Sequence, residues 1–241
     1  MRAVFIAITL IACSSHNSST PDAMIMHDAP PDSPLDAPPD APPSLDCPTY
    51  CAEINANCKG TNAQYADDEA CLHACGTFAV GTSTVTDMSG NTLGCRIYHA
   101  GAPSKTSPEA ECPRAGPAGD LITASPGGPA YCSGGDFCTT FCTLEIAACG
   151  TQEAPLPTDP RDSNNNHVFQ YTNMDSCMSN CPDFDRTHIY SPTALGDSLA
   201  CRLAQSITAL VSITPGATMH CSSTSLNINP PFGFCFGTPT P

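Results

Sequence analysis

The sequence contains no tryptophan, few aromatic residues (6%), and only 8 lysines and arginines against 23 aspartates and glutamates. The net charge of −15 argues against a nucleic-acid binder, and against a polybasic contact with anionic lipid, because both require a basic face. Few aromatic side chains also limit the size of a hydrophobic core. The 17 cysteines among the 241 residues are therefore the expected source of stability if the chain is exported.

Several chemical motifs are missing as well. There is no Cys-x2-Cys pair of the kind common in zinc sites, no haem-attachment motif and no Gly-x-Ser-x-Gly nucleophile elbow. Full pairing of the cysteines would leave no thiol to act as a nucleophile. The sequence thus predicts no enzyme, no cofactor and no metal site.

The first hydrophobic run is too short to cross a membrane. Residues 1–12 have one positive charge, at Arg2, followed by a run of ten residues that is apolar except for Thr9, whereas a spanning helix needs roughly 20. This layout is typical of a secretory signal peptide. The sequence Leu10-Ile11-Ala12-Cys13 at its end resembles the bacterial lipobox, and this resemblance implies that Cys13 is lipidated.

The cysteine count agrees with this interpretation, because removing Cys13 leaves 16 cysteines that can pair completely. By the same resemblance, Ser14 in place of Asp implies an outer-membrane destination, with the protein facing the periplasm or the cell surface. The chain would contact the membrane through the lipid on Cys13. An unknown protein or envelope component is the other expected partner.

Residues 13–46 form a lipidated cysteine and a linker. Asp-Ala-Pro-Pro recurs three times, and no lysine or arginine occurs in the segment. Proline removes backbone donors and fixes φ, so neither a helix nor a sheet ladder is expected. A semi-rigid spacer of about 3.1 Å per residue is predicted.

From Cys47 onward the cysteines fall into two octets with similar spacing. Four of the seven successive steps are identical, and other residues keep the same register. We interpret this as an internal duplication into domains 47–135 and 136–241, which we expect to fold independently. Matching residues include Tyr50 with Phe141, Tyr65 with Tyr171, Phe78 with Phe184 and Arg96 with Arg202.

Each copy is predicted to be a small, mainly α-helical unit of three helices and four disulfides. Cys47, Cys51, Ile54 and Cys58 share one helical face. Cys71 and Cys75 stand one turn apart on a second helix, for which Asp67 is the expected N-cap. A third helix is expected before Cys95 and before Cys201, with Asn91 or Asp197 as the cap.

Two antiparallel helices that each carry Cys-x3-Cys can be joined by two bridges. The pattern resembles the twin CX3C hairpin of small intermembrane-space chaperones, in geometry alone. The other two bridges of each copy are predicted from the shared helical face and by exclusion. The full prediction is Cys47–Cys75, Cys51–Cys71, Cys58–Cys95, Cys112–Cys132, Cys138–Cys181, Cys142–Cys177, Cys149–Cys201 and Cys221–Cys235.

The expected function is that of a noncatalytic interaction or structural module of the cell envelope. The layout resembles cysteine-rich lipoproteins with Asp-Ala-Pro linkers, a resemblance that implies no activity. Arg96 and His99 lie three residues apart on the third helix, so an alternative is a small-ligand or metal-binding lipoprotein that uses this pair. The second copy keeps Arg202 but has Gln205 in place of His99, which favours a structural role for the arginine. A secreted hydrolase is a third hypothesis.

Overall fold

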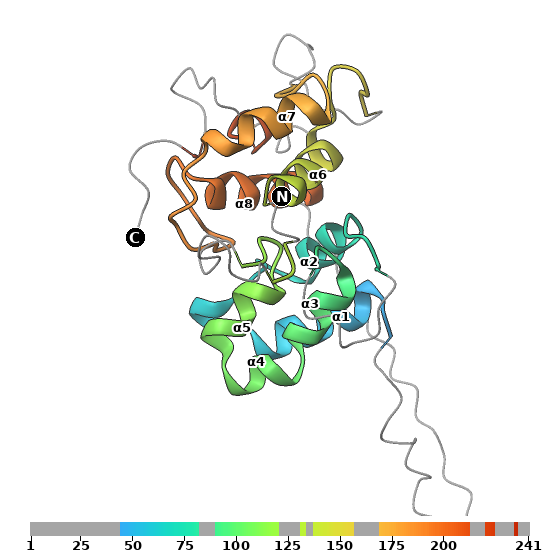
Figure 1. Ribbon diagram of the computed structural model, residues 1–241, viewed down its shortest axis with the longest axis vertical. Helices are drawn as coiled ribbons and strands as arrows, with labels where there is room; N and C mark the ends of the chain where they lie inside the picture. The colour runs from blue at the N-terminus through green and yellow to red at the C-terminus, as the bar shows by residue number, and fades with distance from the viewer. Residues whose placement is uncertain are drawn as a thin grey trace, which may run out of the picture. The chain divides into compact units, whose positions relative to one another are not determined.

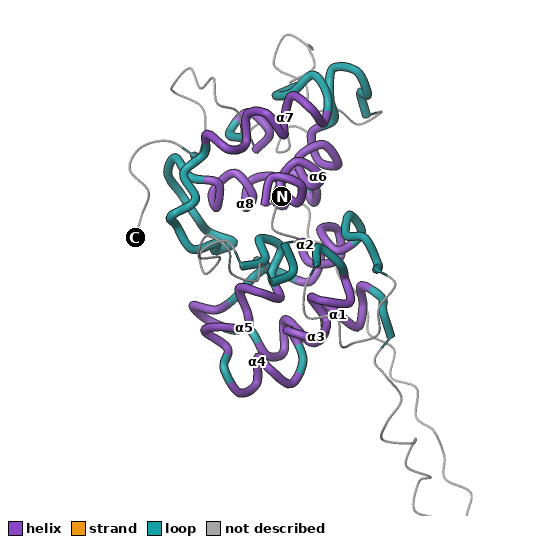
Figure 2. The backbone as a smooth tube through the Cα atoms, viewed as in Figure 1, coloured by secondary structure: helices purple, strands orange, loops and turns teal. Residues whose placement is uncertain are grey.

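The computed structural model describes residues 44–81, 90–120, 131–133, 137–156, 169–212, 220–224 and 234–235. Within these ranges the regular structure is helical, apart from one isolated bridge between Ala79 and Thr92 (Figure 2). This confirms a small, disulfide-rich, mainly α-helical fold. The predicted signal segment, most of the linker and Cys13 lie outside the described residues. No helix of the described part combines the length and apolarity needed to cross a membrane.

The described residues of the first half of the cysteine-rich region form five α-helices and one 3-10 helix. Asp46 caps the first helix by accepting from the Thr49 N–H at 2.8 Å, and Asp67 caps the second as predicted. In chain order the elements are α1 (Cys47–Asn57), η1 (Gly60–Asn62), α2 (Asp68–Cys75), α3 (Leu93–Ala100), α4 (Ala102–Thr106) and α5 (Pro108–Ala115).

The second half has helices at the places of α1, α2 and α3, and fewer helices are described there. Asn173 and Ser176 form a capping box at the start of the middle helix, because each side chain accepts from the backbone of the other. The elements are α6 (Phe137–Cys149), α7 (Met174–Asn180), η2 (Cys181–Asp183) and α8 (Leu199–Val211).

The caps of α3 and α8 lie one residue later than predicted. Thr92 and Ser198 accept from the Cys95 and Cys201 N–H groups, each at 3.2 Å. An N-cap side chain must reach the N–H three residues ahead. That position is occupied by Thr92 and Ser198, so the predicted caps Asn91 and Asp197 precede the true ones.

Helices α4 and α5 were not predicted from the sequence. Both start at proline-containing turns, with Pro103 and Pro108 in their first turns, and Pro113 lies inside α5. Proline is accepted in the first turn because its missing N–H would be unpaired there in any case. Because proline breaks a helix at interior positions, such segments give no clear helical pattern in the sequence.

A single hydrophobic cluster runs through both halves. It includes Tyr50 and Ile54 of α1 together with Phe141 and Leu144 of α6, and helix α2 contacts α8 (Figure 1). Residues 42–241 form one compact unit. The division of this unit at residue 135, and the folding of each half alone, stay predictions.

Candidate functional site

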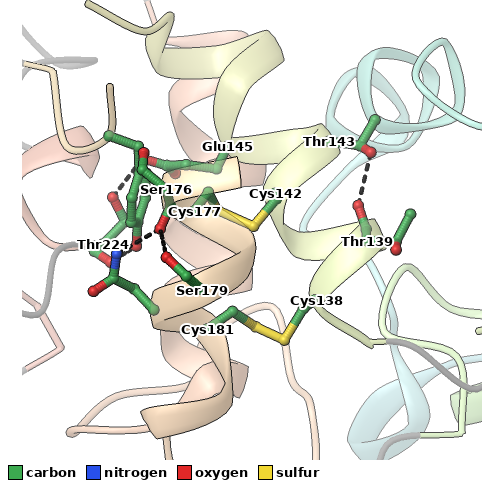
Figure 3. Close-up of a disulfide and its surroundings, with 12 residues drawn as sticks. Cys138, Thr139, Cys142, Thr143, Glu145, Ser176, Cys177, Ser179, Cys181 and Thr224 are labelled. Carbon is green, nitrogen blue, oxygen red and sulfur yellow. Dashed lines mark hydrogen bonds between the residues drawn. A yellow bond between two sulfur atoms is a disulfide. The ribbon is translucent and has the colours of Figure 1, made fainter. Parts of the chain in front are cut away.

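Two rungs of disulfide join the first two helices of each half. Cys142–Cys177 joins α6 to α7, and Cys138–Cys181 joins α6 to the first residue of η2, directly after α7. The two bridges lie next to each other between these segments (Figure 3), with Cα–Cα distances of 5.8 and 5.6 Å. The first half has the same two rungs between α1 and α2, with the same two distances. These four bridges are the ones expected for a Cys-x3-Cys hairpin. They connect Cys47–Cys75, Cys51–Cys71, Cys138–Cys181 and Cys142–Cys177.

The other bridges differ from the prediction. Cys58–Cys95 and Cys112–Cys132 are wrong, because α5 brings Cys112 to Cys58 at the end of α1. Cys95 is then left to pair with Cys132. In the second half, Cys149–Cys201 and Cys221–Cys235 are wrong in the same way, and the observed bridges are Cys149–Cys221 and Cys201–Cys235. Both halves therefore have one bridging order.

Each half buries one arginine completely against one phenylalanine. Arg96 on α3 lies over Phe78 with its guanidinium carbon 3.9 Å from the ring centroid, and Arg202 on α8 lies over Phe184 at 4.1 Å. Each arginine also donates to the carbonyl of the residue that caps its own helix, at 3.3 and 3.2 Å. Burial lowers the pKa of Arg96. The matched geometry is that of a structural contact that joins a helix to the preceding loop.

His99 lies in a different environment from Arg96. It is 2% exposed, and its Nδ1 is 2.5 Å from Glu111 Oε2 on α5. The other Glu111 oxygen accepts from Arg114 at 2.6 Å. The Arg114 guanidinium lies over the ring of Tyr131, 4.2 Å from its centroid, and that ring meets the His99 imidazole edge to face at 5.3 Å. His99, Glu111, Arg114 and Tyr131 are called the histidine cluster below.

The predicted pair of Arg96 and His99 is therefore not one site. Arg96 contacts Phe78, whereas His99 contacts Glu111 and Tyr131 of the histidine cluster. A ring nitrogen of His99 and the sulfur atoms of Cys95 and Cys132 all lie within 4.8 Å of one another. In this structure the two sulfurs are joined as a disulfide, with an S–S distance of 1.98 Å.

The second half replaces this cluster with other polar residues. His220 Nδ1 lies 2.6 Å from Gln205 Oε1, and the His220 ring stacks on Phe234 at 5.2 Å. Cysteine numbering within the octets aligns Gln205 with His99, and His220 with Glu111. In the second half the histidine therefore stands at the position of Glu111. The position of His99, four residues after the third-helix cysteine, is held by Gln205.

Glu145 is a second buried polar centre, and the sequence did not point to it. It is 1% exposed on α6 and lies near Thr224 (Figure 3), whose Oγ1 donates to it at 2.6 Å. Its other carboxyl oxygen accepts from Ser206 Oγ at 2.7 Å. Burial raises its pKa to about 7, although both hydrogen bonds act in the opposite direction. Alignment of the two cysteine octets could have identified it, because Glu145 takes the place of Ile54 on the cysteine-bearing face.

Glu111, Arg114 and Tyr131 were also missed. Each lies 12 or more residues from His99 in sequence, and α5, which carries Glu111 and Arg114, was not predicted. No periodicity links such distant positions. Only the pairing of Cys95 with Cys132 and the formation of α5 bring them together.

The helices and bridges define a cysteine-rich, all-α protein in which each described α-helix except α4 contributes a disulfide-bonded cysteine. Residues 47–140 match the family model described as the BfoA family C-terminal domain. The match begins with the first residue of α1, ends within α6 and covers less than half of the chain. No curated protein and no solved structure matches the chain. The number of disulfides is typical of an oxidising compartment outside the cytoplasm.

Proposed function

We propose that the chain is an outer-membrane lipoprotein in which a duplicated cysteine-rich region acts as a noncatalytic interaction module. The signal-like segment, the lipobox-like end at Cys13 and the Pro/Asp-rich linker support anchoring and spacing from a membrane. The shared bridging order of the two octets supports duplication. In the cysteine-rich region the bridges and the buried arginines rigidify the scaffold, as suits a binding surface.

A surface groove with exposed apolar side chains is the observation that carries the interaction role. The groove has a volume of about 460 Å³ and lies in the connection between η2 and α8. Two apolar side chains that line it are unusually exposed, Ile189 at 69% and Leu195 at 46%. Exposed aliphatic side chains at a concave surface are typical of protein-binding sites. The groove is lined by Thr61, Thr187, His188, Ile189, Tyr190, Ser191, Thr193, Ala194, Leu195 and Ser198.

Capture of an envelope partner should therefore depend on Ile189. The experiment is an affinity capture with the oxidised mature chain, with captured proteins identified by mass spectrometry and their binding then measured with purified components. Ile189→Asp should weaken binding on the order of tenfold or more, since it places a charge in an apolar contact. Leu72→Asp is the matched control, because Leu72 is 42% exposed on α2 and does not line the groove. Equal affinities for both variants would contradict the proposal.

Lipidation at Cys13 is expected in native membranes. Mass analysis of the N-terminal peptide should find a diacylglyceryl adduct on Cys13, and Cys13→Ser should move the protein into the soluble fraction. Arg2 and the apolar run stay intact in this variant, so export itself should continue. An unmodified Cys13, or a mature chain that starts elsewhere, would refute the anchor.

A small-ligand or metal-binding role is the second candidate. The observation that favours it is the position of the buried His99 beside Cys95 and Cys132. Arg96 contributes to the scaffold in this interpretation, since it lies over Phe78.

A further inference from the structure

The Cys95–Cys132 bridge is surrounded by groups that metal sites require. Cys95 and Cys132 are fully buried, and each offers a sulfur within 4.8 Å of a His99 ring nitrogen. Two thiolates and one imidazole form a ligand set that binds zinc in proteins, and the fourth position is then open to water or another ligand. Among the described residues this is the group of cysteine, histidine and carboxylate side chains that meets the spacing for a metal ion.

The surroundings of His99 resemble the outer shell of a zinc site. Glu111 occupies Nδ1, so Nε2 is the nitrogen that would face a metal. A metal-bound histidine usually donates its other ring N–H to a carboxylate, which sets its tautomer and orientation. Glu111 is itself held by Arg114, whose guanidinium lies over Tyr131.

The disulfide form has no thiolate to offer to a cation. Cys132 has φ of 50°, and among the described residues it is the non-glycine residue with a positive φ. That conformation is unfavourable for a residue with a Cβ. Opening the bridge would allow Cys132 to leave this conformation, which favours reduction here over reduction at a bridge with relaxed backbone.

We propose that reduction of Cys95–Cys132 creates a binding site for a thiolate-preferring divalent cation such as Zn²⁺, with Cys95, Cys132 and His99 as ligands. This inference gives the second candidate function a site, and it is independent of partner capture at Ile189. The cation would bind only in the reduced form, so the bridge acts as the gate of the site.

The chemistry balances with a dithiol as the reductant. One thiolate of the dithiol attacks one sulfur of the bridge, and the other cysteine leaves as a thiolate that is then protonated. The second thiol of the donor attacks the mixed disulfide, which releases the first cysteine and closes the donor into a disulfide. Two electrons have then passed from the dithiol to the bridge. Binding of Zn²⁺ releases two protons as both thiols become thiolate ligands.

The second half provides an internal comparison. Its matching bridge is Cys201–Cys235, where Gln205 takes the place of His99. A glutamine amide is a poor ligand for Zn²⁺ next to thiolates. The proposal therefore predicts one cation for each chain, bound in the first half.

The experiment uses the whole chain with Cys13→Ser, so that every remaining cysteine starts in a bridge. The protein is treated with graded amounts of a small dithiol, desalted without oxygen and titrated with Co²⁺, which reports thiolate ligation by a charge-transfer absorption band. We expect about one Co²⁺ per chain after reduction and none before it. Zn²⁺ should displace the Co²⁺ and protect Cys95 and Cys132 from alkylation, as mapped by mass spectrometry.

The variants separate a built site from unspecific binding by reduced cysteines. His99→Gln copies the second half and should weaken Co²⁺ binding at least tenfold, and Glu111→Gln should weaken it about 10- to 100-fold. Cys201→Ser with Cys235→Ser should leave the affinity unchanged. Far-ultraviolet circular dichroism of the oxidised variants checks that each one folds. Co²⁺ binding that ignores His99 and Glu111, or alkylation protection at cysteines other than Cys95 and Cys132, would overturn the proposal.

Discussion

Replacing Cys58 and Cys112 together with serine is expected to lower the free energy of unfolding by about 4 kcal/mol. This bridge spans 54 residues and joins the end of α1 to α5. Its removal frees a long loop in the unfolded chain, and the entropy gained by the unfolded state grows with loop length. Both sulfurs are buried, at 4% and 0% exposure, so the new hydroxyls would also lie in the core.

The matched control is the double replacement of Cys47 and Cys75. The bridge between Cys51 and Cys71 still holds α1 to α2 in that variant, so only the few residues outside it gain freedom. A loss of about 2 kcal/mol is expected. Urea unfolding under non-reducing conditions measures both, and equal losses would show that the longer loop does not dominate.

Helical spacing explains why half of the bridges could be predicted. A Cys-x3-Cys pair on each of two neighbouring helices leaves one antiparallel arrangement in which both pairs meet, and the structure has it in both halves. Cys58, Cys95, Cys112 and Cys132 follow no such rule. Their pairing depends on where α5 lies, and that helix was not predicted from the sequence.

Comparison of the two cysteine octets distinguishes the matched arginines from His99 more clearly than any single motif does. The shared Arg96 and Arg202 have matched aromatic partners, as expected for a structural role. His99 differs between the halves, and it is the residue that lies next to a disulfide. Its partner Glu111 comes from α5, so the carboxylate could not be found before the helix was known.

The cores of the two halves also differ in polarity at matched positions. In the first half, Ile54 is an apolar residue of the core. In the second half, Glu145 takes that place, and Ser206 and Thr224 stand beside it. Octet numbering aligns these two hydroxyl residues with Ala100 and Ala115. Three apolar positions have thus become polar together, which keeps the buried carboxyl hydrogen-bonded.

The stability of the chain should depend on pH through Glu145. Burial raises the pKa of this carboxyl from its ordinary value of 4.5 to about 7 in the folded protein. Between these two values the folded state holds a proton that the unfolded state releases. The stabilisation is therefore fully present below about pH 4.5 and is lost as the pH rises towards 7, by on the order of 3 kcal/mol in total.

Burial is what raises the pKa of Glu145, and the two hydroxyls next to it can hydrogen-bond to the protonated carboxyl as well as to the carboxylate. Ser206 Oγ also lies 2.9 Å from the Arg202 carbonyl, and Thr224 Oγ1 lies 2.7 Å from the Cys221 carbonyl. Each hydroxyl has a single proton, so a carboxylate and a carbonyl compete for it. A protonated carboxyl donates to one hydroxyl, which can then donate to its carbonyl. The charge of Glu145 also acts on Tyr171, because burial and this charge together raise the pKa of the Tyr171 phenol.

Glu145→Gln should reproduce the protonated state at every pH. Its amide donates to one hydroxyl and its carbonyl accepts from the other, so the variant should match the wild type near pH 4.5 and exceed its unfolding free energy by about 3 kcal/mol at pH 8. Glu109→Gln, which alters an exposed glutamate of α5, should leave the pH dependence unchanged. Urea unfolding of all three proteins from pH 4.5 to 8 tests this, with the disulfides intact. Parallel curves for the wild type and Glu145→Gln would mean that Glu145 titrates alike in the folded and unfolded chains.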